Sequence, residues 1–224
     1  MEHSDFLQTL ITTGRLAFWT TFILLIIGLP IAYFLAYSRF KLKPVIEALI
    51  SMPMVLPPTV LGFYILVAYS PQNWFGKILE EWFDVRLAFS FSGILIASVL
   101  CSLPFMIQPL QNGLAALPGS LKEASYTMGK SSFTTFFKVL LPNIQSSVVI
   151  AIAMTFAHCV GEFGIVLMVG GNMPGQTRVA SIALYDEVQV LNYQAANQYA
   201  LILFVTSFIV LTLIYSIHRK KTGL

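Results

Sequence analysis

Residues 123–142 read EASYTMGKSSFTTFFKVLLP, a polar and basic segment between two long apolar runs. The pattern predicts a short helix over 121–128, which Gly129 ends by taking a left-handed conformation. Ser131 or Ser132 then caps a second helix, and Pro142 marks the start of the next apolar run. Two helices that meet at an angle form either a docking surface for another protein or a connector on a membrane surface. Each helix is expected to gather one set of residues on one face: Leu121, Ala124, Ser125 and Met128, then Phe133, Phe136, Phe137 and Leu140.

The composition indicates a membrane protein. Of the 224 residues, 57% are hydrophobic and only 10% are charged, and the mean hydropathy is +0.78. A soluble domain usually carries about 25% charged residues, and the apolar runs here are long enough to cross a bilayer. Neither cysteine has the spacing of a metal or redox site, and the three histidines are scattered. We therefore expect an all-α polytopic membrane protein without a metal site.

Five runs of about 20 mainly apolar residues are candidate spans. The second run contains three prolines and the third contains two. The predicted spans are 16–37, 45–69, 91–111, 147–169 and 199–217. No internal repeat is evident, so residues 1–224 are predicted to form one transmembrane domain with a core at about 10–217.

The basic residues favour one orientation of these spans. The segments after spans one and three and the tail after span five hold most of the lysines and arginines, whereas the other segments hold most of the acids. By the positive-inside rule the basic set is cytoplasmic. The N-terminus is then outside and the C-terminus is cytoplasmic, as an odd number of spans requires. The segment 119–142 is consequently expected to be a cytoplasmic loop.

This segment resembles the coupling loop in the integral membrane subunits of binding-protein-dependent ABC importers. The family pattern is E-A-A, three residues, G, nine residues, I, any residue and L-P. The chain matches it in register, with Ser125 in place of alanine and Val139 in place of isoleucine. The resemblance implies the type I transmembrane fold of ABC importers and a loop that docks in a groove of the ATP-hydrolysing subunit. The expected coupling residues are Glu123, Ala124, Ser125, Gly129, Leu141 and Pro142.

The second predicted span contains SMPMVLPPTVLGF at residues 51–63. Pro57 and Pro58 remove backbone donors, and such a break is tolerated at membrane depth where protein or a water-filled path satisfies the backbone. The break is either a structural kink or part of a helix that lines a substrate path. The stretch resembles P-L-V-L-P-P-x-V-x-G of molybdate permeases. Hydroxyls such as Thr59 and Ser102, or amides at helix ends, are expected to make only weak contacts with an oxyanion.

Residues 157–178 contain Glu162, an acid well inside a predicted span. An intramembrane carboxylate is a candidate functional group. A bare carboxylate would repel an anion, so a structural hydrogen-bond or ion-pair role is favoured. Gly161 and Gly164 flank it and permit close helix approach. The G-E-F-G tetrad resembles sulfate and molybdate permeases alike.

The following run, N-x-P-G-x-T-R at residues 172–178, resembles the molybdate branch of these permeases. It lies outside the membrane by the predicted topology. Arg178 would contact a binding protein, attract an oxyanion or be an ordinary surface arginine. The candidate contacts for a binding protein are Asn172, Pro174, Gly175, Thr177 and Arg178.

Together these resemblances imply the permease subunit of an ATP-driven importer that carries molybdate across the inner membrane by alternating access. The sequence lacks a G-x-x-x-x-G-K-[ST] loop, so we expect no enzyme activity and no cofactor, with ATP bound by a partner. Five spans form too small a wall for a gated path, so a homodimer is expected. Other expected partners are two ATP-binding cassette subunits, a periplasmic or lipid-anchored oxyanion-binding protein and the lipid bilayer, but no nucleic acid. The alternatives are the same machine for tungstate or sulfate, and a stand-alone secondary carrier.

Overall fold

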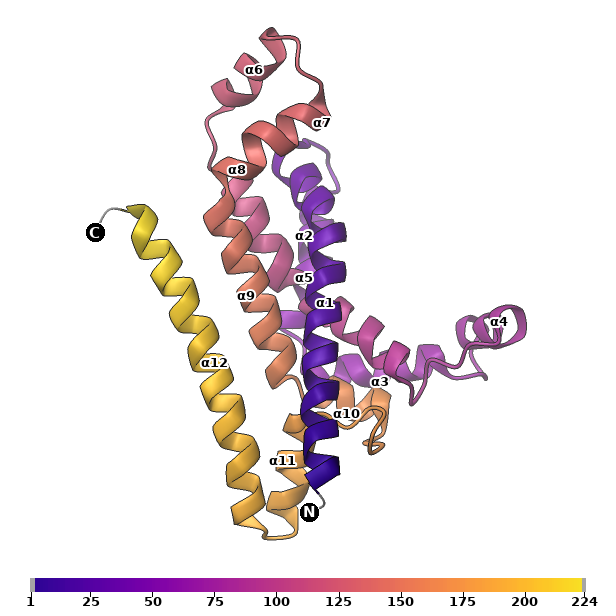
Figure 1. Cartoon of the computed structure of the whole chain (residues 1–224). Coiled ribbons are helices and arrows are strands. Elements are labelled where there is room, and N and C mark those ends of the chain that lie inside the picture. The colour runs from indigo at the N-terminus through magenta and orange to yellow at the C-terminus, as the bar shows by residue number, and fades with distance from the viewer. Residues whose placement is uncertain (1–2, 223–224) are drawn as a thin grey trace.

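The computed structural model describes residues 3–222, and within this range the protein is an elongated helical bundle without strands (Figure 1). The all-α prediction is therefore confirmed. The elements are α1 (His3–Tyr37), α2 (Lys43–Ser51), η1 (Met52–Met54), α3 (Pro58–Tyr69), α4 (Trp74–Phe83), α5 (Phe91–Ala115), α6 (Gly119–Thr127), α7 (Ser132–Thr135), η2 (Phe136–Leu140), α8 (Leu141–Asn143), α9 (Gln145–Gly161), α10 (Gly164–Gly170), α11 (Ala180–Gln189) and α12 (Tyr193–Thr222).

Three helices are long and apolar enough to cross a membrane, and they cover Asp5–Tyr37, Phe91–Ala115 and Tyr193–Leu213. Two further pairs of helices are apolar enough together but are bent, so each is either a broken span or a re-entrant loop. The pair Lys43–Met54 and Pro58–Tyr69 turns by 107°, and the pair Ser132–Asn143 and Gln145–Gly161 turns by 78°. Five spans result when each bent pair is counted as one, which agrees with the predicted number.

The prediction of one continuous span over 147–169 is wrong. Helix α9 ends at Gly161, and α10 begins only at Gly164. Between them Glu162 takes an extended conformation, with φ −69° and ψ 130°. The apolar pattern did not reveal this break because the residues on both sides of it are equally hydrophobic. Glu162 therefore lies in irregular backbone, which membrane proteins tolerate where it is buried in protein or borders a cavity.

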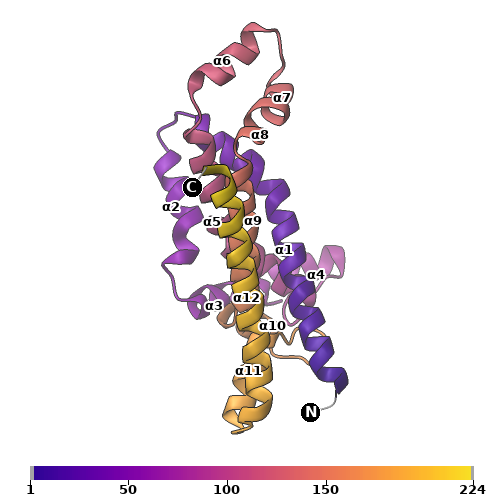
Figure 2. The ribbon, with the colours of Figure 1, turned by 60° about the vertical axis from the view of Figure 1, so that its left-hand side comes forward.

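Helices α1, α5 and α9 pack together along the bundle, and α12 lies against α9 and α11 (Figures 1 and 2). The loop between α1 and α2 and the α6–α7 loop lie at one end of the molecule. The start of α1, together with α10 and α11, lies at the other end. The two loops that the charge pattern predicts to be cytoplasmic are thus on the same end.

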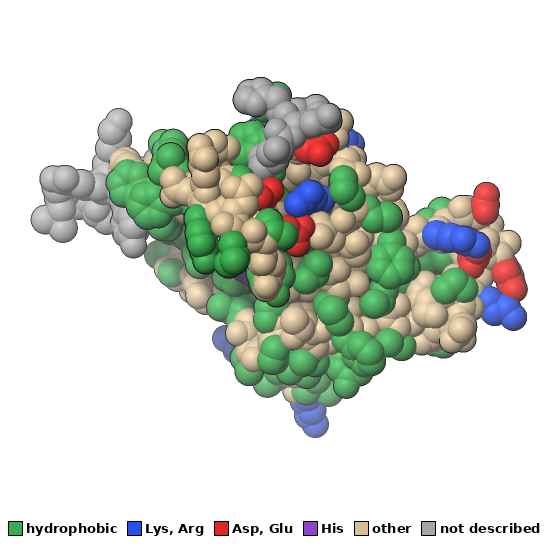
Figure 3. Space-filling model, turned by 90° about the horizontal axis from the view of Figure 1, so that it is seen from below, with side chains coloured by type: hydrophobic (Ala, Val, Ile, Leu, Met, Phe, Trp, Pro, Cys, Tyr) green, Lys and Arg blue, Asp and Glu red, His purple; other side chains and the backbone are tan. Residues whose placement is uncertain are grey.

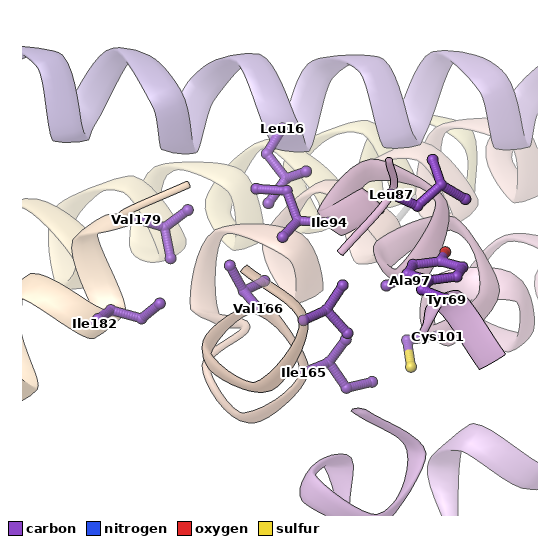
Figure 4. Close-up of a cluster of buried hydrophobic side chains, with 11 residues drawn as sticks. Leu16, Tyr69, Leu87, Ile94, Ala97, Cys101, Ile165, Val166, Val179 and Ile182 are labelled. Atoms are coloured by element: carbon purple, nitrogen blue, oxygen red, sulfur yellow. The ribbon is translucent and has the colours of Figure 1, made fainter. Parts of the chain in front are cut away.

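The two largest buried clusters of the described residues both involve α1 and α5. In the first, Leu16 of α1 lies against Ile94 of α5, with Val166 of α10 beside them (Figure 4). The second joins α1 and α5 nearer the α6 end. There, a Cβ on Gly28 would lie 2.9 Å from Cγ of Met106, so only glycine allows this close approach. Lipid is as apolar as the core, so such close packing of helices is what stabilises the bundle.

Helix α4 reaches sideways from the bundle (Figure 1) and is amphipathic. Trp74, Ile78 and Trp82 are exposed and recur at every fourth position. Lys77 pairs with Glu81 on another face, with 3.6 Å between Nζ and Oε1. Figure 3, seen from the end that carries α10 and α11, shows charged side chains gathered on the far tip of this arm. Exposed tryptophans next to charges are typical of a helix at a membrane–water interface.

Candidate functional site

The α6–α7 loop protrudes from one end of the bundle (Figure 1) and has a glycine-terminated helix end. Gly129 has φ +73°. The N–H of Gly129 donates to the carbonyl of Tyr126 at 2.9 Å, and the N–H of Lys130 donates to that of Ser125 at 3.1 Å. This pair of hydrogen bonds defines a Schellman motif. The predicted left-handed glycine is confirmed, and a Cβ there would meet no atom within 4 Å, so the requirement is purely conformational.

The second helix of the loop begins as predicted, because the Ser131 hydroxyl accepts a hydrogen bond from the N–H of Thr134 at 3.2 Å. The two short helices are joined by the buried hydroxyls of Ser125 and Thr135, which lie 2.8 Å apart. Ser125 is the position at which the importer motif carries alanine. Its hydroxyl therefore adds a link between α6 and α7 that alanine could not make.

The predicted grouping of residues on the two loop faces is only partly right. Ser125 and Leu140 are buried, but Met128 and Phe133 are 74% and 73% exposed. Residues Phe136–Leu140 form a π-helix, whose wider turn breaks the 3.6-residue period used for the prediction. The exposed Glu123, together with Met128 and Phe133, leaves an outward surface on the loop that the rest of the chain does not cover.

Lys122 anchors this loop to α1, a role that the sequence did not reveal. Its Nζ lies 4.3 Å from the ring centroid of Tyr37, 5.3 Å from that of Tyr33 and 5.9 Å from that of Tyr126. A cation over several aromatic faces is attracted by their quadrupoles. The two tyrosines of α1 are four residues apart, which was the one signal available in the sequence.

The remaining predicted coupling residues lie where the loop meets the bundle. Ala124 and Pro142 are exposed and Leu141 is half-buried. Leu141 and Pro142 form α8, which leads into α9 through the 78° bend. The loop is therefore connected to the start of α9 through α8.

At the other end of α9, a cavity of about 550 Å³ lies between α3, α5, α9 and α10. It brings together five of the predicted path residues. These are Pro58, Thr59, Gly161, Glu162 and Gly164. A Cβ on Gly164 would lie 3.0 Å from Cβ of Pro58 and 3.4 Å from N of Thr59, so this glycine lets α10 reach the N-terminus of α3.

The other two predicted path residues lie outside the cavity lining. Pro57 precedes α3 and caps it. Ser102 is fully buried, with its hydroxyl 3.1 Å from Nδ1 of His158 and 3.2 Å from Sγ of Cys159. It therefore orients His158, which does line the cavity, rather than offering its own hydroxyl to a substrate.

Glu162 is 7% exposed, and its Oε2 has no hydrogen-bond partner. Within residues 3–222 its carboxyl group forms no ion pair. Its backbone carbonyl is held by the Ser181 hydroxyl at 2.6 Å. The Ser98 hydroxyl interacts with its carboxyl group, so the favoured hydrogen-bond role keeps one candidate side-chain partner and stays a prediction.

His158 and Cys159 are the nearest chemically active neighbours of Glu162. One potential ligand atom from each of the three residues lies within 4.8 Å of the others. A soft divalent cation takes such a set of ligands. The prediction of no metal site missed this cluster, because it considered only the spacing of the cysteines and of the histidines, and not a histidine, a cysteine and an acid within five residues.

The predicted docking run at 172–178 forms the turn between α10 and α11. Thr177 is fully buried and donates to the carbonyl of Gly170 at 2.6 Å. Asn172 and Arg178 both donate to the same carboxyl oxygen, Oδ2 of Asp186, at 2.8 and 3.0 Å. These three predicted contact residues therefore hold the turn in place. The other two, Pro174 and Gly175, are exposed on its outside.

Comparison with known proteins identifies the family. Residues 28–222 match the family model described as "Binding-protein-dependent transport system inner membrane component". The chain is 42% identical to the molybdenum transport system permease protein ModB of Azotobacter vinelandii over 95% of this chain and 94% of that protein. It is 32% identical to a probable sulfate transport system permease protein cysT of Zygnema circumcarinatum over 88% of this chain and 68% of that protein.

Among solved structures, a chain of the inward-facing MetNI methionine ABC transporter superposes with a TM-score of 0.74 at 19% identity, covering 98% of this chain and 99% of that one. An amino acid ABC transporter gives a TM-score of 0.65 at 19% identity, with 97% and 94% covered. These likenesses establish the ABC importer transmembrane fold. With the family match over most of its length, the chain belongs to the inner membrane components of binding-protein-dependent transport systems.

Proposed function

We propose that this permease subunit carries molybdate in an ATP-driven importer. The substrate assignment is supported by 42% identity to a molybdenum permease over nearly the whole of both chains. The similarity to sulfate permeases is lower and covers a smaller part of those proteins. Sulfate or tungstate carried by the same machine is therefore the second candidate.

The single observation that carries the ATP-driven mechanism is the protruding α6–α7 loop. Its backbone is fixed by the Schellman motif at Gly129, its two helices are joined through Ser125, and Lys122 ties it to α1. A rigid loop with an uncovered outer surface suits docking in a groove of an ATPase subunit. When two ATPase subunits bind ATP and close on each other, they would push the loop and tilt α9. ATP hydrolysis would let the loop and α9 return.

We further propose that two copies of the chain enclose the path and that the α6 end faces the cytoplasm. The mouth of the cavity is bordered by α3, whose outer side exposes Phe63, Tyr64 and Val67. One copy leaves this apolar side uncovered, and a symmetric second copy would cover it. An oxyanion-binding protein would then deliver its ligand at the opposite end, where Pro174 and Gly175 are exposed.

The test is transport by vesicles that contain this chain with the ATPase and binding protein that co-purify with it. ATP-dependent uptake of radiolabelled molybdate, with excess molybdate and tungstate competing better than sulfate, is the expected result. Vesicles that lack the ATPase are the control. Equal uptake without the ATPase would contradict the coupled mechanism and support a secondary carrier, and preferential uptake of sulfate would transfer the proposal to that anion.

A further inference from the structure

The cavity at the α9–α10 break contains a buried carboxyl group whose purpose the fold does not explain. The Glu162 side chain is 7% exposed and borders the cavity, and its Oε2 has no hydrogen-bond partner. Its backbone is fixed from α11 by Ser181. The Ser98 hydroxyl interacts with this carboxyl group. Buried polar atoms are nearly always hydrogen-bonded, so a carboxyl group with an unpartnered oxygen at the wall of a cavity is a candidate for contact with a ligand.

The surroundings of Glu162 favour the uncharged acid. No lysine or arginine in the described part of the chain pairs with it. A buried carboxylate without a counter-charge is so costly that the group instead keeps its proton. A protonated carboxyl group has an O–H donor, whereas a carboxylate only accepts hydrogen bonds. In this form Glu162 attracts an oxyanion instead of repelling it.

The opposite wall of the cavity is the N-terminus of α3. Pro57 and Pro58 start this helix of 12 residues, and Val60 and Leu61 donate to the carbonyl of Pro57. Within residues 3–222 no acceptor is found for the backbone N–H of Thr59, which borders the cavity. Free N–H groups at a helix N-terminus, where the helix dipole is positive, favour an anion.

His158 supplies a third group. Its ring is stacked on Phe105 with 4.1 Å between centroids, and its Nδ1 contacts the Ser102 hydroxyl. The ring is thus fixed in place, and Nε2 has no partner among the residues that the structure describes. The cavity therefore combines donors from α3 and the α9–α10 break with an oriented imidazole, and it contains no lysine or arginine.

We propose that this cavity is an oxyanion subsite of the transport path, in which the protonated Glu162 carboxyl and the Thr59 end of α3 donate hydrogen bonds to the anion. The volume of about 550 Å³ equals roughly 18 water molecules at about 30 Å³ each, so a tetrahedral oxyanion fits with part of its hydration shell. The proton stays on Glu162 throughout. Neutral donors hold an anion weakly, which allows it to leave. This assignment rests on the proposed function for the identity of the anion.

The first test compares two substitutions in the assembled importer. Glu162→Gln keeps the shape and a donor but can never carry a negative charge, and uptake of molybdate should stay within about threefold of wild type. Glu162→Ala removes the donor and should lower uptake about tenfold or more. Equal loss in both variants would overturn the proposal, because it would show that a charged carboxylate is needed, as in a cation site shared with His158 and Cys159.

A second pair of variants tests the cavity without touching the carboxyl group. Gly161 lines the cavity and a Cβ there meets no atom within 4 Å, so Gly161→Leu should reduce the cavity volume. The matched control is Gly14→Leu, on the exposed side of α1, where a Cβ also meets nothing. Uptake should fall in the first variant and not in the second. Normal uptake by Gly161→Leu would exclude the cavity from the path.

A third measurement needs the purified full-length chain alone. Thr59→Cys should react with a charged thiol reagent, and millimolar molybdate, but not chloride, should slow this reaction. The same chain without the added cysteine gives the background reaction of the native cysteines. No protection would overturn the subsite. If wild-type importer takes up molybdate while Thr59→Cys is unprotected, the subsite alone fails. If protection is seen but no ATP-dependent uptake occurs, the proposed function fails instead.

Discussion

Replacing Gly129 isolates the role of the α6–α7 loop, because its glycine is needed only for backbone conformation. The residue has φ +73°, and a Cβ would meet no neighbour within 4 Å. A Cβ there causes no steric clash within the described structure. Within this chain, the effect of a substitution therefore comes from the cost of holding a side chain in the left-handed region.

That cost differs between amino acids in a known order. A left-handed conformation costs about 1 kcal/mol for alanine, which lowers the equilibrium constant for the native loop conformation about fivefold. A β-branched residue is a stronger outlier and costs about 2–3 kcal/mol, or roughly 30- to 150-fold. Asparagine tolerates this region and should lose least. Uptake should therefore fall in the order Gly, Asn, Ala, Val at position 129.

The assay is ATP-dependent uptake of molybdate, with the amount of permease in the membrane measured in parallel. Because Gly129 lies near one end of the bundle and belongs to neither of the two largest buried clusters, all variants should insert and accumulate normally (Figure 1). The rate of ATP hydrolysis by the complex should either stay high without molybdate uptake or fall along with uptake. If the Gly129→Val variant takes up molybdate as well as the Gly129→Asn variant, the Schellman geometry is not needed to transmit the movement of the α6–α7 loop, and the argument is refuted.

Three further predictions concern close contacts. Gly113→Ala places a Cβ in a clash with the Ser147 side chain of α9, so it should lower stability by about 1–3 kcal/mol and reduce uptake. Gly119→Ala, with nothing within 4 Å, should do neither, and equal thermal melting of the two variants would contradict this. Ser125→Ala leaves the facing buried threonine without its partner and should cost about 1 kcal/mol, seen as faster proteolysis of the loop; unchanged cleavage would show that the link contributes nothing. If Arg178 and Asp186 only hold their turn, Asp186→Ala should impair uptake at least as much as Arg178→Ala, because Asp186 also accepts a hydrogen bond from Asn172; a larger loss in the arginine variant would indicate contact with the anion or a binding protein.

The elements that sequence predicted well are those with local causes. Long apolar runs, the left-handed glycine and the serine cap each depend on a few neighbouring residues, and α1, α5 and the α6–α7 loop are found where the sequence placed them. The broken second span was also predictable, because Pro57 and Pro58 lack the donors that a continuous helix needs.

The features that sequence missed depend on contacts between distant segments. The break at Glu162 has no proline, and it exists because Gly164 lets α10 turn toward the α3 N-terminus. The cation–aromatic contacts of Lys122 join segments about 85 residues apart, and the pairing of Asn172 and Arg178 with one carboxyl group needs α11 to pack beside their turn. A pattern within one segment carries no signal for such contacts.

One helix, α9, joins the α6–α7 loop to the cavity at the α9–α10 break. Helix α9 has 17 residues and is therefore about 25 Å long. Its first turn is fixed against α5, where Ser147 fits into the space left by Gly113. The bend from α8 lies just before this contact, and the cavity lies beyond the far end at Gly161. A small tilt about the contact, driven at the loop, would thus be enlarged at the cavity, where it changes the distance between Glu162 and the α3 end. This geometry explains how a subsite with only weak donors could be opened and closed by an ATPase that never touches it.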